Sequence, residues 1–132
     1  MRLQNYGTVL ATIADKDKAE ALPLIRRFYN LGFNIQATEG TARFLQANGI
    51  RTHVLKKISE GSSEIPESIR QGHVAYIITT REIGAADSES DGLRIRQSAT
   101  ENNATIFTSL DTVRVLLDVL EETTLTISTI DA

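Results

Sequence analysis

The chain has 132 residues, 41% of them hydrophobic, no cysteine, and a formal net charge of −3 with a pI near 5.4. This length and apolar content fit a single domain over residues 1–132, and the absence of cysteine excludes disulfides and thiolate metal sites. The acidic balance argues against a nucleic-acid binder, and without a long apolar run or a signal peptide we expect no membrane contact and a cytoplasmic location.

Strand and helix signals alternate through the first half of the chain. Residues 8–13 are β-branched and apolar, which predicts a central strand, and helically spaced apolar residues after Asp17 predict a helix that Gly32 ends with a left-handed cap. Pro23 predicts a slight kink or a late start of that helix. The pattern then predicts a strand at 33–37, a helix at 41–47 and a strand at 52–55.

The second half is less regular. A polar loop at 56–63 precedes a short helix expected at 66–69, and residues 73–80 carry the strongest strand signal of the chain. Residues 84–92 are rich in Gly, Ala, Asp and Ser, which predicts an exposed loop. A helix at 93–101, a strand at 105–107 and a helix at 109–120 follow, and the tail from Thr123 is expected to form an edge strand or to fray.

Five strands separated by helices predict an α/β domain of three layers, a five-stranded parallel sheet with helices on both faces. In such a sheet the carboxyl ends of the strands meet at one edge, where ligands bind. The two histidines, His53 and His73, fall in different predicted elements, so we expect both at the surface and no metal site.

The stretch FNIQATEGTARF, residues 33–44, joins a strand tip to a helix start. Free N–H groups of the first helical turn, the positive end of the helix dipole, the hydroxyls of Thr38 and Thr41 and the flexible Gly40 together suit a phosphate or a carboxylate. The alternative is an ordinary βα turn in which Thr41 only caps its own helix.

Other polar residues follow the remaining strands at the same edge. Thr12 ends the first strand, Lys57 follows the third, and Thr79 and Thr80 end the fourth, while Lys18 in the first turn of the first helix can reach them. Each alone is an ordinary surface or strand residue, and only their convergence predicts a phosphate pocket.

The motifs GTVLATIADKDK, LGFNIQATEGTARFL, KKISEG, IRQGHVAYIITT and IRQSA, in this order, resemble the methylglyoxal-synthase-like domain. Within that superfamily the chain is most similar to the C-terminal regulatory domain of the carbamoyl phosphate synthetase large subunit. The likeness runs from about Tyr6 to Leu120. The resemblance implies a five-stranded parallel sheet flanked by helices, in agreement with the pattern above.

The resemblance also implies a function. Domains of this kind do no chemistry, need no cofactor and bind a phosphorylated effector such as uridine monophosphate (UMP) or phosphoribosyl pyrophosphate. They regulate ATP- and Mg-dependent centres in the rest of a large subunit that pairs with a glutaminase small subunit and makes carbamoyl phosphate for pyrimidine or arginine synthesis. A chain that starts almost at its first strand and holds no ATP-binding motif is then expected to be an excised domain.

The family's effector site maps onto this sequence by resemblance. Lys18, Thr38 and Thr41 match its phosphate cradle, Lys57 a lysine near the nucleotide, and Thr12 the pocket floor. Thr79 and Thr80 stand where the family has Asn-Thr on the ribose and base side. Thr79 lacks the amide of that asparagine, which favours an effector recognised through its phosphates.

Two further functions stay open. A methylglyoxal synthase acting on dihydroxyacetone phosphate needs a carboxylate base, which that enzyme carries in a Gly-Gly-Asp-Gln motif. The matching residues 60–63 read EGSS, without the aspartate, although Glu60 or Glu64 could replace it. The third possibility is a protein-contact module with a vestigial pocket.

Overall fold

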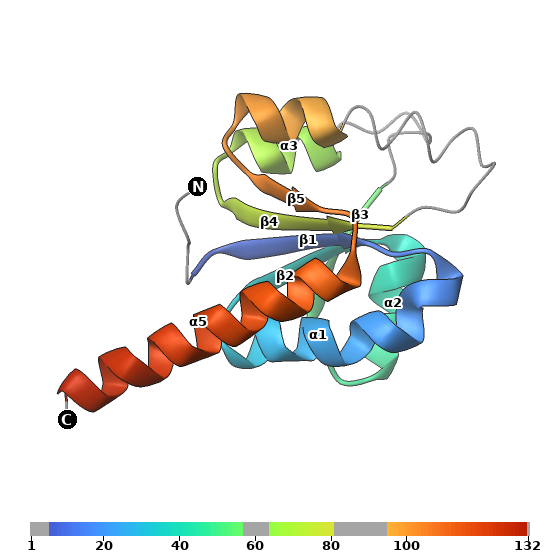
Figure 1. The fold of residues 1–132 in the computed structure, drawn as a ribbon. Coiled ribbons are helices and arrows are strands. Elements are labelled where there is room, and N and C mark those ends of the chain that lie inside the picture. Colours follow the sequence, from blue (N-terminus) through green and yellow to red (C-terminus); the bar gives the residue numbers. More distant parts are fainter. Residues whose placement is uncertain (1–5, 57–63, 81–94, 132) are drawn as a thin grey trace.

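The computed structural model describes residues 6–56, 64–80 and 95–131 (Figure 1). Side chains are described as far as Thr123, except that of Pro66. Its centre is a five-stranded sheet in the order β3-β2-β1-β4-β5, in which all neighbouring strands are parallel. The predicted α/β fold class is therefore confirmed. Lys57 and residues 84–92 lie outside the described residues.

The order of elements follows the alternation expected from the sequence. A further helix covers residues 95–101. The elements are β1 (Thr8–Thr12), the 3₁₀ turn η1 (Asp15–Asp17), α1 (Lys18–Asn30), β2 (Asn34–Thr38), α2 (Glu39–Ala47), β3 (Thr52–Leu55), α3 (Glu64–Arg70), β4 (Val74–Thr79), β5 (Thr105–Phe107) and α5 (Leu110–Asp131).

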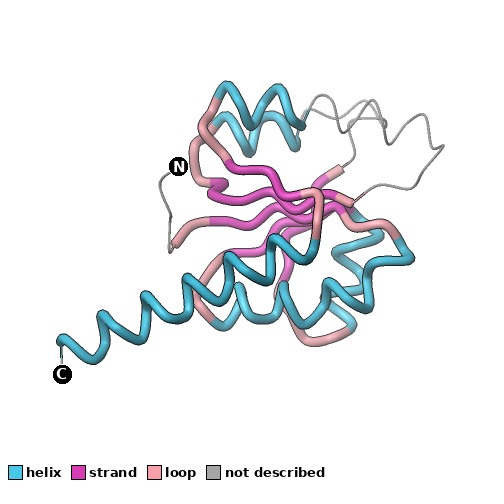
Figure 2. Tube along the Cα trace, in the orientation of Figure 1, coloured by secondary structure: helices cyan, strands magenta, loops and turns pink. Residues whose placement is uncertain are grey.

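Helices cover both faces of the sheet (Figures 1 and 2). Buried side chains of α1, α2 and α5 pack against one face, where Val9, Ala11 and Ile78 point toward them. Buried side chains of α3 and of helix 95–101 pack with Leu10 and Ile77 on the other face. The change of face between neighbouring residues is the two-residue period of a strand.

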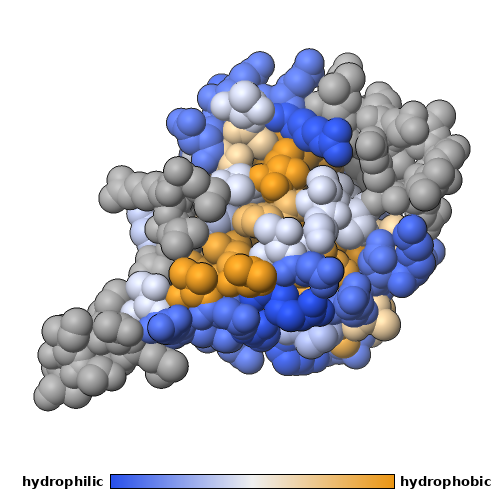
Figure 3. All heavy atoms as spheres, viewed as in Figure 1, coloured by the Kyte–Doolittle hydropathy of each residue, from blue (hydrophilic) through white to orange (hydrophobic). Residues whose placement is uncertain are grey.

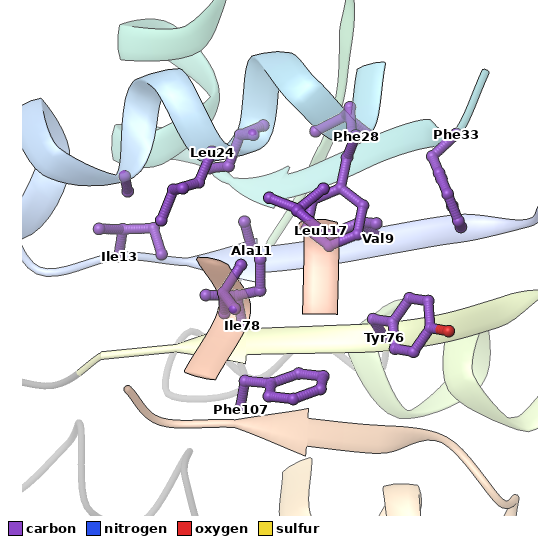
Figure 4. Close-up of a cluster of buried hydrophobic side chains, with 14 of the residues drawn as sticks. Val9, Ala11, Ile13, Leu24, Phe28, Phe33, Tyr76, Ile78, Phe107 and Leu117 are labelled. Atoms are coloured by element: carbon purple, nitrogen blue, oxygen red, sulfur yellow. The ribbon is translucent and has the colours of Figure 1, made fainter. Parts of the chain in front are cut away.

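Aromatic side chains fill the larger of the two cores (Figure 4). The ring of Phe28 on α1 lies 5.3 Å from that of Phe33, edge to face, and 6.0 Å from that of Tyr76 on β4. Phe107 of β5 lies 6.0 Å from Tyr76 on the other side. The rings therefore connect α1, the central sheet and the edge strand in one packed unit.

An ion-pair cluster joins α1 to α5. Arg27 donates from Nε to Glu121 Oε2 at 3.1 Å and from Nη2 to Glu121 Oε1 at 2.5 Å, and also contacts Asp118 at 2.7 Å. The hydrogen bonds that Arg27 donates lower the pKa of Glu121 below its ordinary value, and the carboxylates of Glu121 and Asp118 that accept them raise the pKa of Arg27. The cluster thus fixes α5 against α1 at the rim of the core.

The main differences from the predicted bounds concern three helices. The second helix begins at Glu39 rather than at residue 41, because Thr38 already holds the extended backbone of an N-cap. The third helix begins at Glu64 instead of Pro66. The strand or frayed end expected after Thr123 is wrong, because α5 continues as a helix to Asp131.

The surface is mainly hydrophilic around its rim, and hydrophobic side chains reach it near the middle of the view in Figure 3. Both histidines, His53 and His73, are exposed, as predicted. No helix within the described residues is long and apolar enough to cross a membrane.

Candidate functional site

Three neighbouring strands end in threonines at the same edge of the sheet. Thr12 of β1 is the register partner of Thr79 of β4, and Ala11 is the partner of Ala37, which places Thr38 beside Thr12 on the other side. Neighbouring strands lie about 4.8 Å apart, so the three residues span about 10 Å. We call Thr38, Thr12 and Thr79 the threonine row.

The threonine row faces the side of the sheet that α3 covers. Leu10 and Ile77, each two residues before a member of the row, belong to the core under α3. Gln36, two residues before the third member, accepts a hydrogen bond from Ser68 of α3 at 2.6 Å. Residues two apart in a strand point to the same face, so the row lies on this face at its carboxyl edge.

Two hydroxyls of the row are buried, and the described part of the chain offers neither of them a hydrogen-bond partner. Thr38 is 6% exposed and its side chain makes no capping hydrogen bond, while Thr79 is 8% exposed. Neither side chain forms a hydrogen bond within the described residues. Because buried polar groups are nearly always hydrogen-bonded, these hydroxyls are available to a ligand or to water.

The amine of Lys18 lies over the first turn of α2. It is 3.8 Å from the position that a Cβ on Gly40 would occupy, and the lysine side chain is only 16% exposed. Its ion-pair partner is Asp15, whose side chain is 84% exposed. An ammonium facing the positive end of a helix is best stabilised by an anion between them, a role that the exposed carboxylate of Asp15 fills in part. We call Lys18, Thr38 and the first turn of α2 around Gly40 the cradle.

Thr41 makes a different contact from either one considered from the sequence. Its Oγ1 accepts the N–H of Ile13 at 3.1 Å and lies 3.4 Å from the carbonyl oxygen of the same residue. The side chain is 3% exposed. Thr41 therefore does not cap its own helix through its hydroxyl, and instead ties α2 to the chain that leaves β1.

Thr80 ties the end of β4 to the chain that leaves β1. Its Oγ1 accepts the N–H of Ala14 at 2.8 Å, and its own N–H donates to the carbonyl oxygen of Thr12 at 3.0 Å. Of the predicted site residues, the described structure thus brings Thr12, Lys18, Thr38, Gly40, Thr41, Thr79 and Thr80 to one edge of the sheet. Lys57 is the one that lies outside the described residues.

A pocket of about 480 Å³ opens at this edge, between the ends of β4 and β5 and the starts of α1 and α5. Its walls are polar and carry charges of both signs. They consist of Lys16, Asp17, Glu20, Thr79, Thr80, Arg96, Thr108, Ser109, Leu110 and Asp111.

Most of these wall residues were missed from the sequence. The rule that gathered the threonines also applies to the fifth strand, after which Thr108 and Ser109 precede α5, so that part of the pocket could have been found. Within the described residues Arg96 forms no ion pair, and it lines the pocket. No group of acidic or histidine side chains there could hold a metal ion.

The family model described as "MGS-like domain" matches residues 20–108. The chain belongs to the MGS-like domain family. The match covers α1 through the end of β5, and so includes most of the sheet and the cradle except Lys18.

Solved structures agree with this fold. A methylglyoxal synthase from Elizabethkingia anophelis is 15% identical to this MGS-like domain, with a TM-score of 0.68 over 87% of this chain and 79% of that one. A second structure, of a protein named ForH, is 17% identical, with a TM-score of 0.57 over 88% of this chain and 80% of the other. At these identities the likeness concerns the fold.

Proposed function

We propose that this MGS-like domain binds a phosphorylated effector, such as UMP or phosphoribosyl pyrophosphate, and acts as the regulatory domain of a carbamoyl phosphate synthase large chain. In this role the domain itself carries out no reaction. The ATP- and Mg-dependent ligase centres and the glutaminase subunit belong to its partners in the synthase.

One observation carries the proposal: the amine of Lys18 lies over the first turn of α2, whose N-cap residue Thr38 has a buried hydroxyl with no hydrogen-bond partner among the described residues. A phosphate in the cradle would accept hydrogen bonds from Lys18, from Thr38 and from the free N–H groups at the start of α2. It would compete with Asp15, the exposed ion-pair partner of Lys18.

The pocket supports an effector larger than phosphate itself. Thr79 lines it and is also a member of the threonine row, which ends at Thr38 in the cradle. A sugar phosphate or nucleotide held by its phosphate in the cradle could therefore extend along the row toward the pocket. The hydroxyls of its sugar ring would then form hydrogen bonds with the threonine hydroxyls of the row.

The alternative is a lyase of the methylglyoxal synthase type, and it is supported by the fold that the chain shares with such an enzyme. That reaction needs a base near the phosphate site. Asp17 and Glu20 are the acidic side chains that α1 and η1 contribute to the pocket, whereas the sequence at 60–63 lacks the aspartate expected there. The residues thus favour binding over catalysis. A module for protein contact alone would need no anion in the cradle.

Calorimetric titration of the chain with UMP, phosphoribosyl pyrophosphate and dihydroxyacetone phosphate tests the proposal. We expect saturable binding of at least one of the first two, and no methylglyoxal or inorganic phosphate released from the third. Lys18→Gln should weaken binding about 10- to 100-fold, because a hydrogen bond to a charged group contributes about 1.5–3 kcal/mol.

Arg26→Gln is the matched control. It removes the same charge from the same helix, about 12 Å from Lys18 along the axis. Arg26 donates to the carbonyl oxygen of Asn48 at 2.7 Å, and Asn48 lies between α2 and β3, away from the carboxyl ends of the strands. Equal loss of affinity in both variants would mean that net charge, and not the cradle, governs binding. Binding of none of the three compounds would leave the protein-contact module as the better hypothesis.

A further inference from the structure

The chain that leaves β1 carries residues of both the cradle and the pocket. After Thr12 it passes through Ile13 and Ala14, which we call the 13–14 turn, and then through η1 into α1. Lys16 and Asp17 of η1 line the pocket, and Lys18 directly after them holds its amine over α2. Any shift of the 13–14 turn therefore moves side chains of both the cradle and the pocket.

Two threonines from other elements hold this turn. Thr41 of α2 binds Ile13 from the side of the cradle, through the contacts of 3.1 and 3.4 Å. Thr80 binds Ala14 at 2.8 Å from the side of the pocket, which it also lines. Both contacts are long-range in the sequence, so the turn is held by tertiary contacts as well as by its own local geometry.

We propose that Thr80 is a positioning residue for the cradle: its hydroxyl fixes the 13–14 turn and, through η1, places the amine of Lys18 over the first turn of α2. This inference rests on the proposed function, because positioning of Lys18 matters only if the cradle binds an anion. Thr80 itself need not touch the phosphate.

The chemistry of Thr80 suits this role. The N–H of Ala14 precedes η1 and has Thr80 Oγ1 as its acceptor in a part-buried hydrogen bond, so removal of the hydroxyl takes away the acceptor of this donor. The simplest response is a shift of the turn toward water. Lys18 lies four residues further along a short 3₁₀ turn, so its amine follows the shift. The β-branched side chain also restricts the rotamers that the hydroxyl can adopt.

Thr80→Val and Thr80→Ser separate shape from hydrogen bonding. Valine keeps the branched shape and lacks the acceptor, whereas serine keeps the acceptor. Thr52→Val is the control for loss of a threonine hydroxyl that binds backbone. Thr52 Oγ1 donates to the carbonyl oxygen of Ile50 at 3.0 Å, a local contact at the opposite end of the strands.

Backbone amide NMR shifts of the ligand-free chain are the first readout. In Thr80→Val we expect the amides of Ala14, Lys18 and Gly40 to shift, and in Thr52→Val we expect these three to stay unchanged. Thr80→Ser should return them close to their wild-type positions. Unchanged Lys18 and Gly40 amides in Thr80→Val would overturn the inference, whatever the chain binds.

Affinity for phosphoribosyl pyrophosphate and UMP, measured by calorimetry, is the second readout. Thr80→Val should weaken binding about five- to tenfold, the effect of one neutral hydrogen bond, and Thr80→Ser and Thr52→Val less than about twofold. If the wild type binds and Thr80→Val binds with the same affinity, the inference is overturned and the proposed function stands. A wild type that binds neither compound would refute the proposed function, and the amide shifts would still decide the role of Thr80.

Discussion

Removal of the Glu121 carboxylate should loosen the contact between α1 and α5. In Glu121→Gln the side chain keeps its size, but the neutral amide can accept at most one of the two hydrogen bonds that Arg27 donates to Glu121 at 2.5 and 3.1 Å, so Asp118 at 2.7 Å becomes the charged partner that remains. We predict a loss of unfolding free energy of about 1 kcal/mol, the upper end of the range for surface pairs. The upper end applies because the geometry is bidentate and Arg27 is only 27% exposed.

The same reasoning gives a smaller effect for Asp118. Asp118→Asn removes a single contact to a carboxylate that is 69% exposed, so water and salt screen it strongly, and we expect less than about 0.5 kcal/mol. A double-mutant cycle between Arg27 and each acid should reproduce this ranking, because the cycle removes the effects of changed packing.

Thermal unfolding followed by circular dichroism measures these losses. For a chain of this size about 1 kcal/mol corresponds to a fall in Tm of about 4 °C. Hydrogen bonds from Arg27 lower the pKa of folded Glu121, so its stabilisation is complete above the unfolded pKa of about 4.3 and is lost as the pH falls through the lower folded value. The difference between wild type and Glu121→Gln should therefore be full at pH 7 and shrink below about pH 4.

Two results would refute this reasoning. The first is an equal loss of stability in Glu121→Gln and Asp118→Asn, which would mean that the bidentate geometry has no effect. The second is a difference between wild type and Glu121→Gln that persists unchanged down to pH 2, which would mean that the carboxylate charge is not its cause.

Three further predictions concern the core and the backbone, and chemical denaturation tests each of them. Leu117→Ala should cost about 2–5 kcal/mol because Leu117 is 0% exposed, whereas Val115→Ala, 63% exposed on the same helix, should change stability by less than about 0.5 kcal/mol. Gly7→Ala should cost more than Gly49→Ala. Both have positive φ, but a Cβ on Gly7 would lie 3.1 Å from a backbone carbonyl oxygen and one on Gly49 would meet nothing. Pro23→Ala should stabilise the chain by roughly 1 kcal/mol, because Pro23 lies inside α1 and is exposed, so alanine restores a helix hydrogen bond without losing core packing.

The sheet was predictable from the sequence because its signals are local. β3 and β5 have the expected bounds, and the other strands differ by a residue or two at their ends. The end of α5 was not predictable in this way. Its sequence from Thr123 to Ile130 is rich in β-branched residues and resembles a strand, but no Gly or Pro interrupts it. Adding residues to an existing helix costs much less than starting one.

The candidate site likewise has a part that was predictable from the sequence and a part that was not. That Thr12, Thr38 and Thr79 end neighbouring strands follows from the parallel sheet, and the sequence predicts it. The contacts of Thr41 and Thr80 do not follow, because the distance in sequence to Ile13 and Ala14 is 28 and 66 residues. Which hydroxyl binds backbone and which stays free depends on tertiary distances of a few tenths of an ångström, and no local pattern carries them.

All five strands run in one direction, so every helix that follows a strand starts at the same edge of the sheet. The partial positive charges of those helix starts add up there, while the chain as a whole is acidic, with a formal net charge of −3. An approaching anion is therefore repelled at long range and attracted at short range. Added salt screens the long-range part first, so moderate ionic strength should speed the capture of a small anion at this edge instead of slowing it.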